Sequence, residues 1–138
     1  MRPNAIKKEL SANDSGETGT HQAGILVPKD PALLSFFPPL DKSVKNPRHS
    51  LVFRDDAGGR WTFEFIYYNN RFFGGTRNEY RLTCMTNYLR SNNLKAGDEV
   101  LLSRDEEGRF SVSFERKKQA VLENGKLRLG STWRIVDL

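Results

Sequence analysis

Alternating hydrophobic and polar residues predict β-strands along much of the chain. Between residues 61 and 68, aromatic residues fall on one face of a strand and mostly polar residues on the other. The aromatic face consists of Trp61, Phe63, Phe65 and Tyr67. Residues 109–115 alternate in the same way, with Phe110, Val112 and Phe114 facing inward. A period of two residues is typical of a half-buried strand.

Short apolar segments between turn-forming residues predict further strands. These are residues 4–10, 24–28, 51–54, 99–104 and 133–136. Turns are expected at 55–59, at 105–108 and at Asn124-Gly125, a pair typical of two-residue hairpins. The polar and basic segment 72–81, with Gly74-Gly75, is expected to be irregular.

Two short helices are predicted at separate places. Asp30 can cap a helix that has Pro31 at its first position and ends before Pro38-Pro39. A second helix is expected over 83–89, stopped by Ser91-Asn92-Asn93. Because about seven strands do not alternate with long helices, we expect a mainly β fold, a closed or nearly closed antiparallel barrel without exposed edges.

Composition narrows the class of protein. The length of 138 residues and a hydrophobic fraction of 37% suit one domain with one core. We expect this domain to span 1–138, with residues 116–138 either completing the barrel or forming a linker. The net charge of +5 favours an anionic partner.

The small number of cysteines and histidines excludes disulfide-stabilised and zinc-stabilised classes of protein. The single Cys84 cannot form an intrachain disulfide, and with only His21 and His49 it cannot complete a zinc site of four Cys and His ligands. No metal and no cofactor is therefore expected. The chain starts without the apolar stretch of a signal peptide and has no apolar run of about 20 residues, so we expect a soluble, cytoplasmic protein without a membrane partner.

Catalytic residues are not expected. Asp55-Asp56 and Asp105-Glu106-Glu107 lie in glycine-flanked turns, where carboxylates usually face solvent. A small metal-dependent nuclease that uses Glu64 and these acidic turns is one alternative, but Ile66 stands where the Glu-x-Lys pattern requires lysine. Cys84 falls at the start of the second predicted helix, where a thiol pKa can be lowered, although a buried structural cysteine is the expected role.

Arg77, Glu79 and Arg81 form the clearest candidate site. They are spaced by two, so in an extended segment their side chains point the same way. Arginine pairs bidentately with guanine, glutamate accepts from the cytosine amino group, and Asn78 can serve adenine. A solvated strand edge with ion pairs is the simpler interpretation of the same pattern.

A polar loop at 11–21 is the second candidate, because its glycines allow a close approach of the backbone to DNA. Basic residues that could contact phosphates are Lys7, Lys8, Lys42, Lys45, Arg48 and Arg71. A module that binds RNA or single strands by stacking is the other alternative, with Tyr67, Tyr68, Phe72 and Phe73 as its aromatic residues. The alternation places Tyr67 toward the core, which weakens this alternative.

Two long stretches resemble the effector-binding N-terminal domain of the EcoRII-like, type IIE restriction endonucleases. They are SANDSGETGTHQAG at 11–24 and IYYNNRFFGGTRNEYRLT at 66–83. The resemblance covers about residues 6–114. It implies a B3-type DNA-binding pseudobarrel that grips the major groove with an N-terminal arm, 11–21, and a C-terminal arm, about 69–81.

The resemblance implies DNA contacts for His21, Arg77, Glu79 and Arg81, and the chemistry of the residues adds the other expected roles. The residues expected to read bases are Arg77, Asn78, Glu79, Arg81 and His21. The residues of the N-terminal arm expected to bind DNA are Ser11, Asn13, Asp14, Ser15, Glu17, Thr18 and Thr20. The expected phosphate contacts are Lys7, Lys8, Asn70, Arg71, Thr76, Tyr80, Lys45 and Arg48. The family pattern has lysines at the positions of Gly75 and Tyr80 and an aromatic residue at Leu26.

The implied function is a non-catalytic effector or targeting domain that reads a CC(A/T)GG site in double-stranded DNA. The nuclease domain would lie elsewhere in the same polypeptide, in the bacterial cytoplasm. The isolated domain is expected to be a monomer, because no exposed apolar helix face is visible in the sequence.

Overall fold

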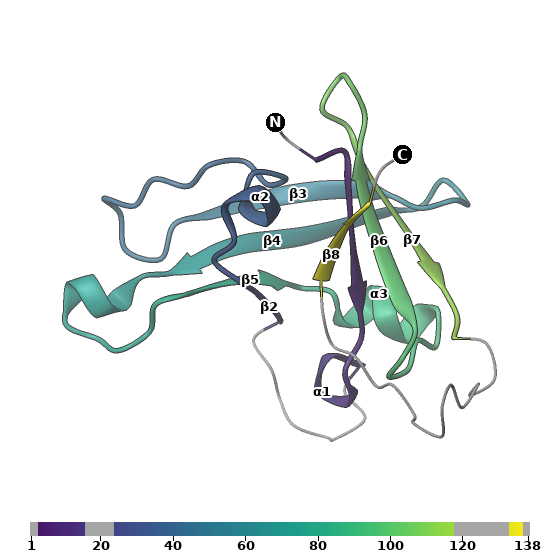
Figure 1. Cartoon of the computed structure of the whole chain (residues 1–138), viewed down its shortest axis with the longest axis horizontal. Helices are drawn as coiled ribbons and strands as arrows, with labels where there is room; N and C mark the ends of the chain where they lie inside the picture. The colour runs from purple at the N-terminus through teal and green to yellow at the C-terminus, as the bar shows by residue number, and fades with distance from the viewer. Residues whose placement is uncertain (1–2, 16–23, 118–132, 137–138) are drawn as a thin grey trace.

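Within the described residues, 3–15, 24–117 and 133–136, the computed structural model is one eight-stranded sheet (Figure 1). Its strands are β1 (Ala5–Glu9), β2 (Ile25–Val27), β3 (Arg48–Arg54), β4 (Arg60–Tyr68), β5 (Glu79–Thr83), β6 (Glu99–Arg104), β7 (Phe110–Glu115) and β8 (Trp133–Val136). The connections hold the short helices α1 (Ala12–Ser15), α2 (Pro31–Leu34) and α3 (Thr86–Ser91) and the 3-10 helix η1 (Asn70–Phe73). The predicted mainly β, nearly closed barrel is confirmed, with eight strands instead of about seven.

The sheet order is β2-β5-β4-β3-β7-β6-β1-β8. Neighbouring strands are antiparallel except β3 and β7, which pair in parallel through Phe53 and Phe110. In Figure 1, β3 and β4 run across the view, whereas β1, β6 and β7 run almost at right angles to them. The sheet therefore curls around its core, and β2 and β8 form the two ends of the strand order.

Aromatic side chains fill the core. Phe37 stacks on Phe65 with ring centroids 4.2 Å apart, and Tyr67 stacks on Tyr80 at the same separation. Phe65 and Tyr80 are 5.6 Å apart, so the stacks form a continuous row. As the alternation predicts, the odd-numbered residues of β4 from Phe63 to Tyr67 are buried on the core side.

β3 begins at Arg48, earlier than expected, and the short helix α1 lies within the expected polar loop, but the main differences from the prediction lie between residues 79 and 86. Residues 79–83 are not irregular but form β5, because their backbone pairs with Glu64–Tyr68 of β4. Thr83 is therefore in a strand, and the following helix begins at Thr86 rather than at residue 83. Cys84 lies between them in a turn with φ of 66° and is exposed, so the expected buried cysteine within a helix is wrong.

Asn69, at the end of β4, attaches the loop before β3 to the β4–β5 connection. Its side chain is buried, and its Oδ1 accepts from the Asn46 N–H at 2.7 Å. Its Nδ2 donates to the carbonyl oxygens of Val44, at 2.9 Å, and Lys42, at 3.3 Å. Because buried amides are costly when unpaired, these bonds fix the two loops against each other.

Gly24 and Gly58 offer a matched test of backbone packing. Both have positive φ, 84° and 85°, but a Cβ on Gly24 would lie 2.3 Å from the Leu82 carbonyl oxygen, whereas a Cβ on Gly58 would meet nothing within 4 Å. We expect Gly58→Ala to cost about 1 kcal/mol of unfolding free energy from strain alone. Gly24→Ala should cost roughly 2 kcal/mol more, since backbone must move. Urea denaturation of both variants measures the difference. Equal losses would show that β2 shifts without cost.

Candidate nucleic-acid interface

The side chains of Arg77, Glu79 and Arg81 point the same way and form one charged row. Arg77 Nε and Nη2 lie 2.9 and 2.8 Å from Glu79 Oε1. Arg81 Nη2 donates to Glu79 Oε2 at 3.2 Å, and Arg81 Nη1 donates to the Gly24 carbonyl oxygen at 2.9 Å. This geometry fits both a row that reads bases and a solvated strand edge with ion pairs. The three residues are ion-paired and still partly exposed, with 37% of the Arg77 side chain accessible.

The Tyr68 ring packs against Arg77, at one end of this row. It stands directly opposite Glu79 in the β4–β5 register, and the Arg77 guanidinium lies 3.8 Å from the centre of its ring. A cation over an aromatic face is attracted by the ring quadrupole. The Arg77 side chain is thus held by a carboxylate on one side and a ring on the other, before any partner binds.

Glu79 is ionised in this setting. Burial favours its neutral form and raises its pKa, but hydrogen bonds from Arg77 and Arg81 outweigh burial, so the pKa stays below the ordinary value. The row therefore carries two positive charges and one negative charge near neutral pH.

The row continues across the outer face of the sheet. Arg81 stands opposite Leu26 of β2 on one side and Ile66 of β4 on the other, and Ile66 stands opposite Arg48 of β3. Side chains of opposite residues share a face. Ile66 is buried here, outside the main core cluster, whereas Leu26 remains 48% exposed. The face therefore combines guanidinium groups with an exposed apolar side chain.

The β4–β5 connection, the predicted C-terminal arm, is folded on itself. The Arg77 N–H donates to Asn70 Oδ1 at 2.6 Å, and the Arg71 N–H donates to the Arg77 carbonyl oxygen at 2.9 Å. Asn70 thus shapes the loop, and its side-chain oxygen is occupied by this bond. Phe72 and Phe73 project from η1, and Phe72 is 67% exposed. Thr76 is also exposed.

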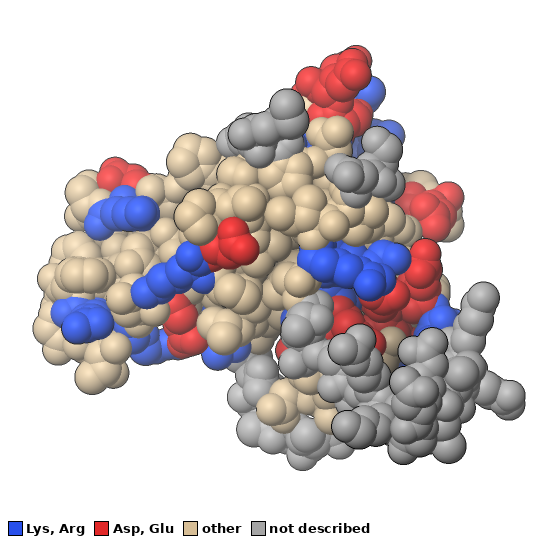
Figure 2. Space-filling model, viewed as in Figure 1, with Lys and Arg blue, Asp and Glu red and all other residues tan. Residues whose placement is uncertain are grey.

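Exposed basic residues surround this arm. Lys42, Lys45 and Arg48 lie on the loop that Asn69 attaches to it and at the start of β3, and Arg71 lies in η1. Figure 2 shows Lys and Arg side chains distributed over the end of the molecule that carries these loops. These four side chains are exposed, so a phosphate could reach them.

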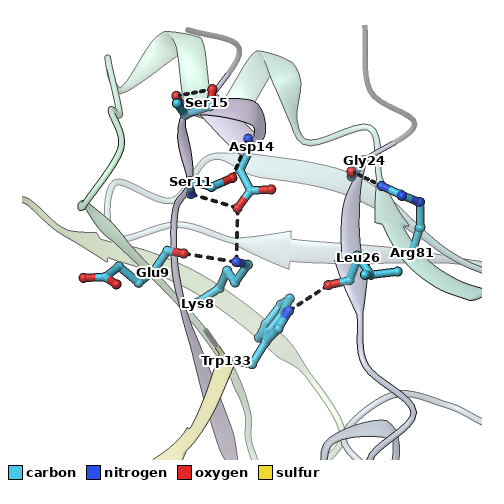
Figure 3. Close-up of polar contacts among 10 residues, drawn as sticks. Lys8, Glu9, Ser11, Asp14, Ser15, Gly24, Leu26, Arg81 and Trp133 are labelled. Carbon is cyan, nitrogen blue, oxygen red and sulfur yellow. Dashed lines mark hydrogen bonds and ion pairs between the residues drawn. The ribbon is translucent and has the colours of Figure 1, made fainter. Parts of the chain in front are cut away.

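The N-terminal arm is described only up to Ser15. The Ser11 N–H donates to Asp14 Oδ2 at 3.0 Å, and the Asp14 N–H donates to Ser11 Oγ at 3.1 Å, a reciprocal capping arrangement around α1 (Figure 3). Lys8 Nζ lies 3.1 Å from Asp14 Oδ2. Ser15 Oγ donates to the Ala12 carbonyl oxygen. Asn13 is exposed. Glu17, Thr18, Thr20 and His21 lie outside the described residues.

Several expected DNA contacts conflict with this geometry. Lys8 is 4% exposed and is held by Asp14, so it is not available to a phosphate. Tyr80 is 8% exposed in the aromatic core, where burial raises the pKa of its hydroxyl. Ser11 and Asp14 bond to each other. Lys7 pairs with Glu115 at 3.2 Å and with Glu99 at 3.9 Å.

Asn78 is not part of the charged row. Its Oδ1 accepts from the Tyr67 hydroxyl at 2.6 Å, and the Tyr67 ring stacks on Tyr80. The side-chain oxygen therefore serves the core, in contrast to the expected adenine contact. Tyr67 itself is 7% exposed, which confirms its inward orientation.

The carboxylates of the catalytic alternative stabilise turns. Asp55 accepts from the Trp61 indole at 2.8 Å and from the Gly59 N–H at 2.7 Å, and the bond from Trp61 lowers its pKa most. Asp105 accepts from the backbone and side chain of Arg109, which lowers its pKa too. Among the residues described, no three His, Cys, Asp or Glu side chains are grouped to hold a metal. That part of the chain also contains no helix long and apolar enough to cross a membrane.

Sequence reasoning did not find Tyr68, Asn69 or Trp133 as residues that organise the site. In the sequence, Tyr68 is a candidate only for stacking on bases, and Asn69 is only the first residue of the expected C-terminal arm. The Ser11-x-x-Asp14 spacing was a usable signal, because it matches the capping pattern. No local sequence pattern indicates that the Asn69 side chain bonds to a loop more than twenty positions away.

Comparison with known proteins identifies the family. The model for the N-terminal domain of restriction endonuclease EcoRII matches residues 4–110. The chain belongs to this family. In fold it is a B3-type pseudobarrel: the Arabidopsis FUS3–DNA complex superposes with a TM-score of 0.63 at 20% identity, covering 81% of this chain and 96% of that one.

Plant proteins are also similar to this EcoRII N-terminal family member. Auxin response factor 5 of Arabidopsis thaliana is 36% identical over 126 residues, which is 90% of this chain and 13% of the plant protein. Auxin response factor 2 of Oryza sativa subsp. japonica is 34% identical over 117 residues, 85% of this chain and 15% of that protein. The chain thus spans less than a fifth of the length of these relatives.

The charge of Glu79 has a testable effect on stability. Because its folded-state pKa is lowered, the carboxylate stabilises the fold above the ordinary carboxyl pKa, and this contribution is lost as the pH falls through the lowered value. We expect Glu79→Gln to lower the free energy of unfolding by about 1 kcal/mol at pH 7 and by less near pH 3. Urea denaturation at both pH values measures this, with Glu106→Gln, in an exposed turn, as control. The same loss at both pH values would contradict the electrostatic origin.

Proposed function

We propose that this domain binds double-stranded DNA sequence-specifically, with the outer face of β5 in the major groove. The observation that carries the proposal is the row of Arg77, Glu79 and Arg81, fixed side by side and accessible. Arg81 Nη1 and Nη2 each donate one hydrogen bond, to Gly24 and to Glu79, and each of these nitrogens carries two hydrogens. Donors therefore remain for the guanine acceptors. One solved structure with a similar fold, the Arabidopsis FUS3–DNA complex, contains DNA, which supports the same kind of partner.

The finer proposal assigns bases to residues. Arg77 and Arg81 read guanines, and Glu79 accepts from a cytosine amino group. The proposed target is CC(A/T)GG, the site that the sequence resemblance implies, and it offers guanine and cytosine at both ends. His21 is proposed to read bases from the N-terminal arm, where Asn13, Glu17, Thr18 and Thr20 are also proposed to contact DNA.

Phosphate contacts are assigned to the exposed basic residues around the C-terminal arm. Lys42, Lys45, Arg48 and Arg71 are exposed and form no ion pair within the described part of the chain, and Thr76 adds an exposed hydroxyl on the same arm as Arg71. Such contacts position a protein on the duplex without reading sequence.

The proposed role is that of a non-catalytic effector or targeting domain. Membership of the EcoRII N-terminal family supports it, because that name describes one part of a restriction endonuclease. A nuclease domain of the same polypeptide would then be the functional partner, in the cytoplasm. The similar plant proteins are named as response factors, so a transcriptional role is the second candidate. A site other than CC(A/T)GG would favour that candidate.

A binding titration tests the proposal. The protein is titrated against a short duplex carrying CC(A/T)GG, against a scrambled duplex and against the single strand, at about 150 mM salt without divalent metal. A preference of roughly a thousandfold for the CC(A/T)GG duplex is expected for specific reading. Equal binding to both duplexes would reject the proposed target, and a preference for the single strand would instead assign exposed Phe72 and Phe73 to base stacking.

Two classes of substitution should separate base reading from phosphate attraction. Arg81→Ala is expected to lose about 1–3 kcal/mol of binding free energy on the specific site and to relax specificity. Arg81→Lys keeps the charge but loses the bidentate geometry, so it should fail similarly. Lys45→Ala should weaken binding to all duplexes about equally and reduce the salt dependence. The same uniform loss for all three variants would contradict the assignment of Arg81 to a base.

A further inference from the structure

Trp133 connects the two ends of the sheet. It lies in β8, at one end of the strand order, and β2 lies at the other end. Its indole Nε1 donates to the Leu26 carbonyl oxygen of β2 at 2.9 Å, as Figure 3 shows. The Trp133 ring also packs against the core cluster. The gap between the two ends of the sheet, called the seam here, is therefore bridged by the Trp133 side chain, which the core holds in place.

The β2 strand needs such support. It has three residues and pairs with β5 at three positions. The Leu26 carbonyl oxygen is bonded by Trp133, on the edge away from β5. Next to this bond, a cavity of about 380 Å³ lies against Lys8, Asp14, Pro28 and Leu33 as well as Leu26 and Trp133. Ile25 and Val27 are buried in the core, so packing holds the inner side of β2, and the Trp133 hydrogen bond attaches the strand next to this space.

Arg81 depends on the same strand. Leu26 stands opposite Arg81 in the register, and the carbonyl oxygen of Gly24 accepts from Arg81 Nη1. A displacement of β2 would therefore move the acceptor that orients the Arg81 guanidinium. It would also move the point where residues 16–23, which include most of the N-terminal arm, rejoin the described chain.

We infer that Trp133 is a positioning residue for DNA recognition: its bond to Leu26 holds β2, and β2 holds Arg81. Trp133 lies outside residues 4–110, which the family model matches, so this contribution comes from the C-terminal segment of this chain. The inference rests on the proposed function, since it assigns Trp133 to the specificity of that same site.

Trp133→Phe tests the inference, because phenylalanine keeps an aromatic ring and removes the donor. We expect binding to the CC(A/T)GG duplex to weaken roughly fivefold to tenfold, the effect of one lost hydrogen bond, and binding to the scrambled duplex to change less than about twofold. Ile135→Ala, on the same strand and 48% exposed, is the matched control and should leave both within about twofold. An unchanged specificity ratio in Trp133→Phe would overturn the inference.

Amide hydrogen exchange provides a readout that does not require DNA. In Trp133→Phe, the amides of Ile25 and Val27 should exchange roughly fivefold to tenfold faster, whereas the amides of Val100 and Leu102 in β6 should not change. Unchanged exchange in β2 would overturn the inference whatever the DNA result. If the unmodified protein does not discriminate between duplexes, the proposed function fails, and the exchange rates alone decide whether Trp133 holds β2.

Discussion

The register between β4 and β5 is the constraint on which the candidate interface depends. On the core side, it stacks Tyr67 on Tyr80 and places Tyr80 beside Phe65. Because side chains alternate along a strand, the same register turns Tyr68, Glu79 and Arg81 to the outer face. A slip by one residue would bury arginine and expose tyrosine, at a large cost in free energy. Core packing therefore determines where the guanidinium groups lie.

Much of this fold could be predicted where one strand carries its own pattern. The expected strands 99–104 and 133–136 coincide with β6 and β8, and the alternation of 61–68 identified nearly all of β4. β5 was missed although Tyr80 and Leu82 alternate with polar residues, because two apolar residues after a polar, glycine-containing segment are a short signal, and the pairing with β4 that defines the strand is not local. The helix at 83–89 was misplaced for the same reason, since Thr83 belongs to that pairing.

The candidate site was predictable only in part. The common direction of Arg77, Glu79 and Arg81 follows from a period of two, which holds whether or not a strand is recognised. Residue type alone does not show that Lys8 and Asp14 pair with each other or that Tyr80 is buried. A lysine or a tyrosine is equally polar in sequence whether it faces a phosphate or, as here, an ion-pair partner or an aromatic core. Burial is decided by the tertiary pairing of strands.

In the proposed function, the presence of Glu79 suits the row to base reading rather than to general attraction of DNA. A carboxylate among phosphates repels them, so a purely electrostatic surface would not place one between two arginines. Here Glu79 fixes both guanidinium groups before binding and reduces the charge of the row, while Lys42, Lys45, Arg48 and Arg71 remain exposed around it. Pre-ordered side chains lose less entropy when they bind. In the proposed function, long-range attraction and base discrimination are thus supplied by different residues of one face, which allows each to change without the other.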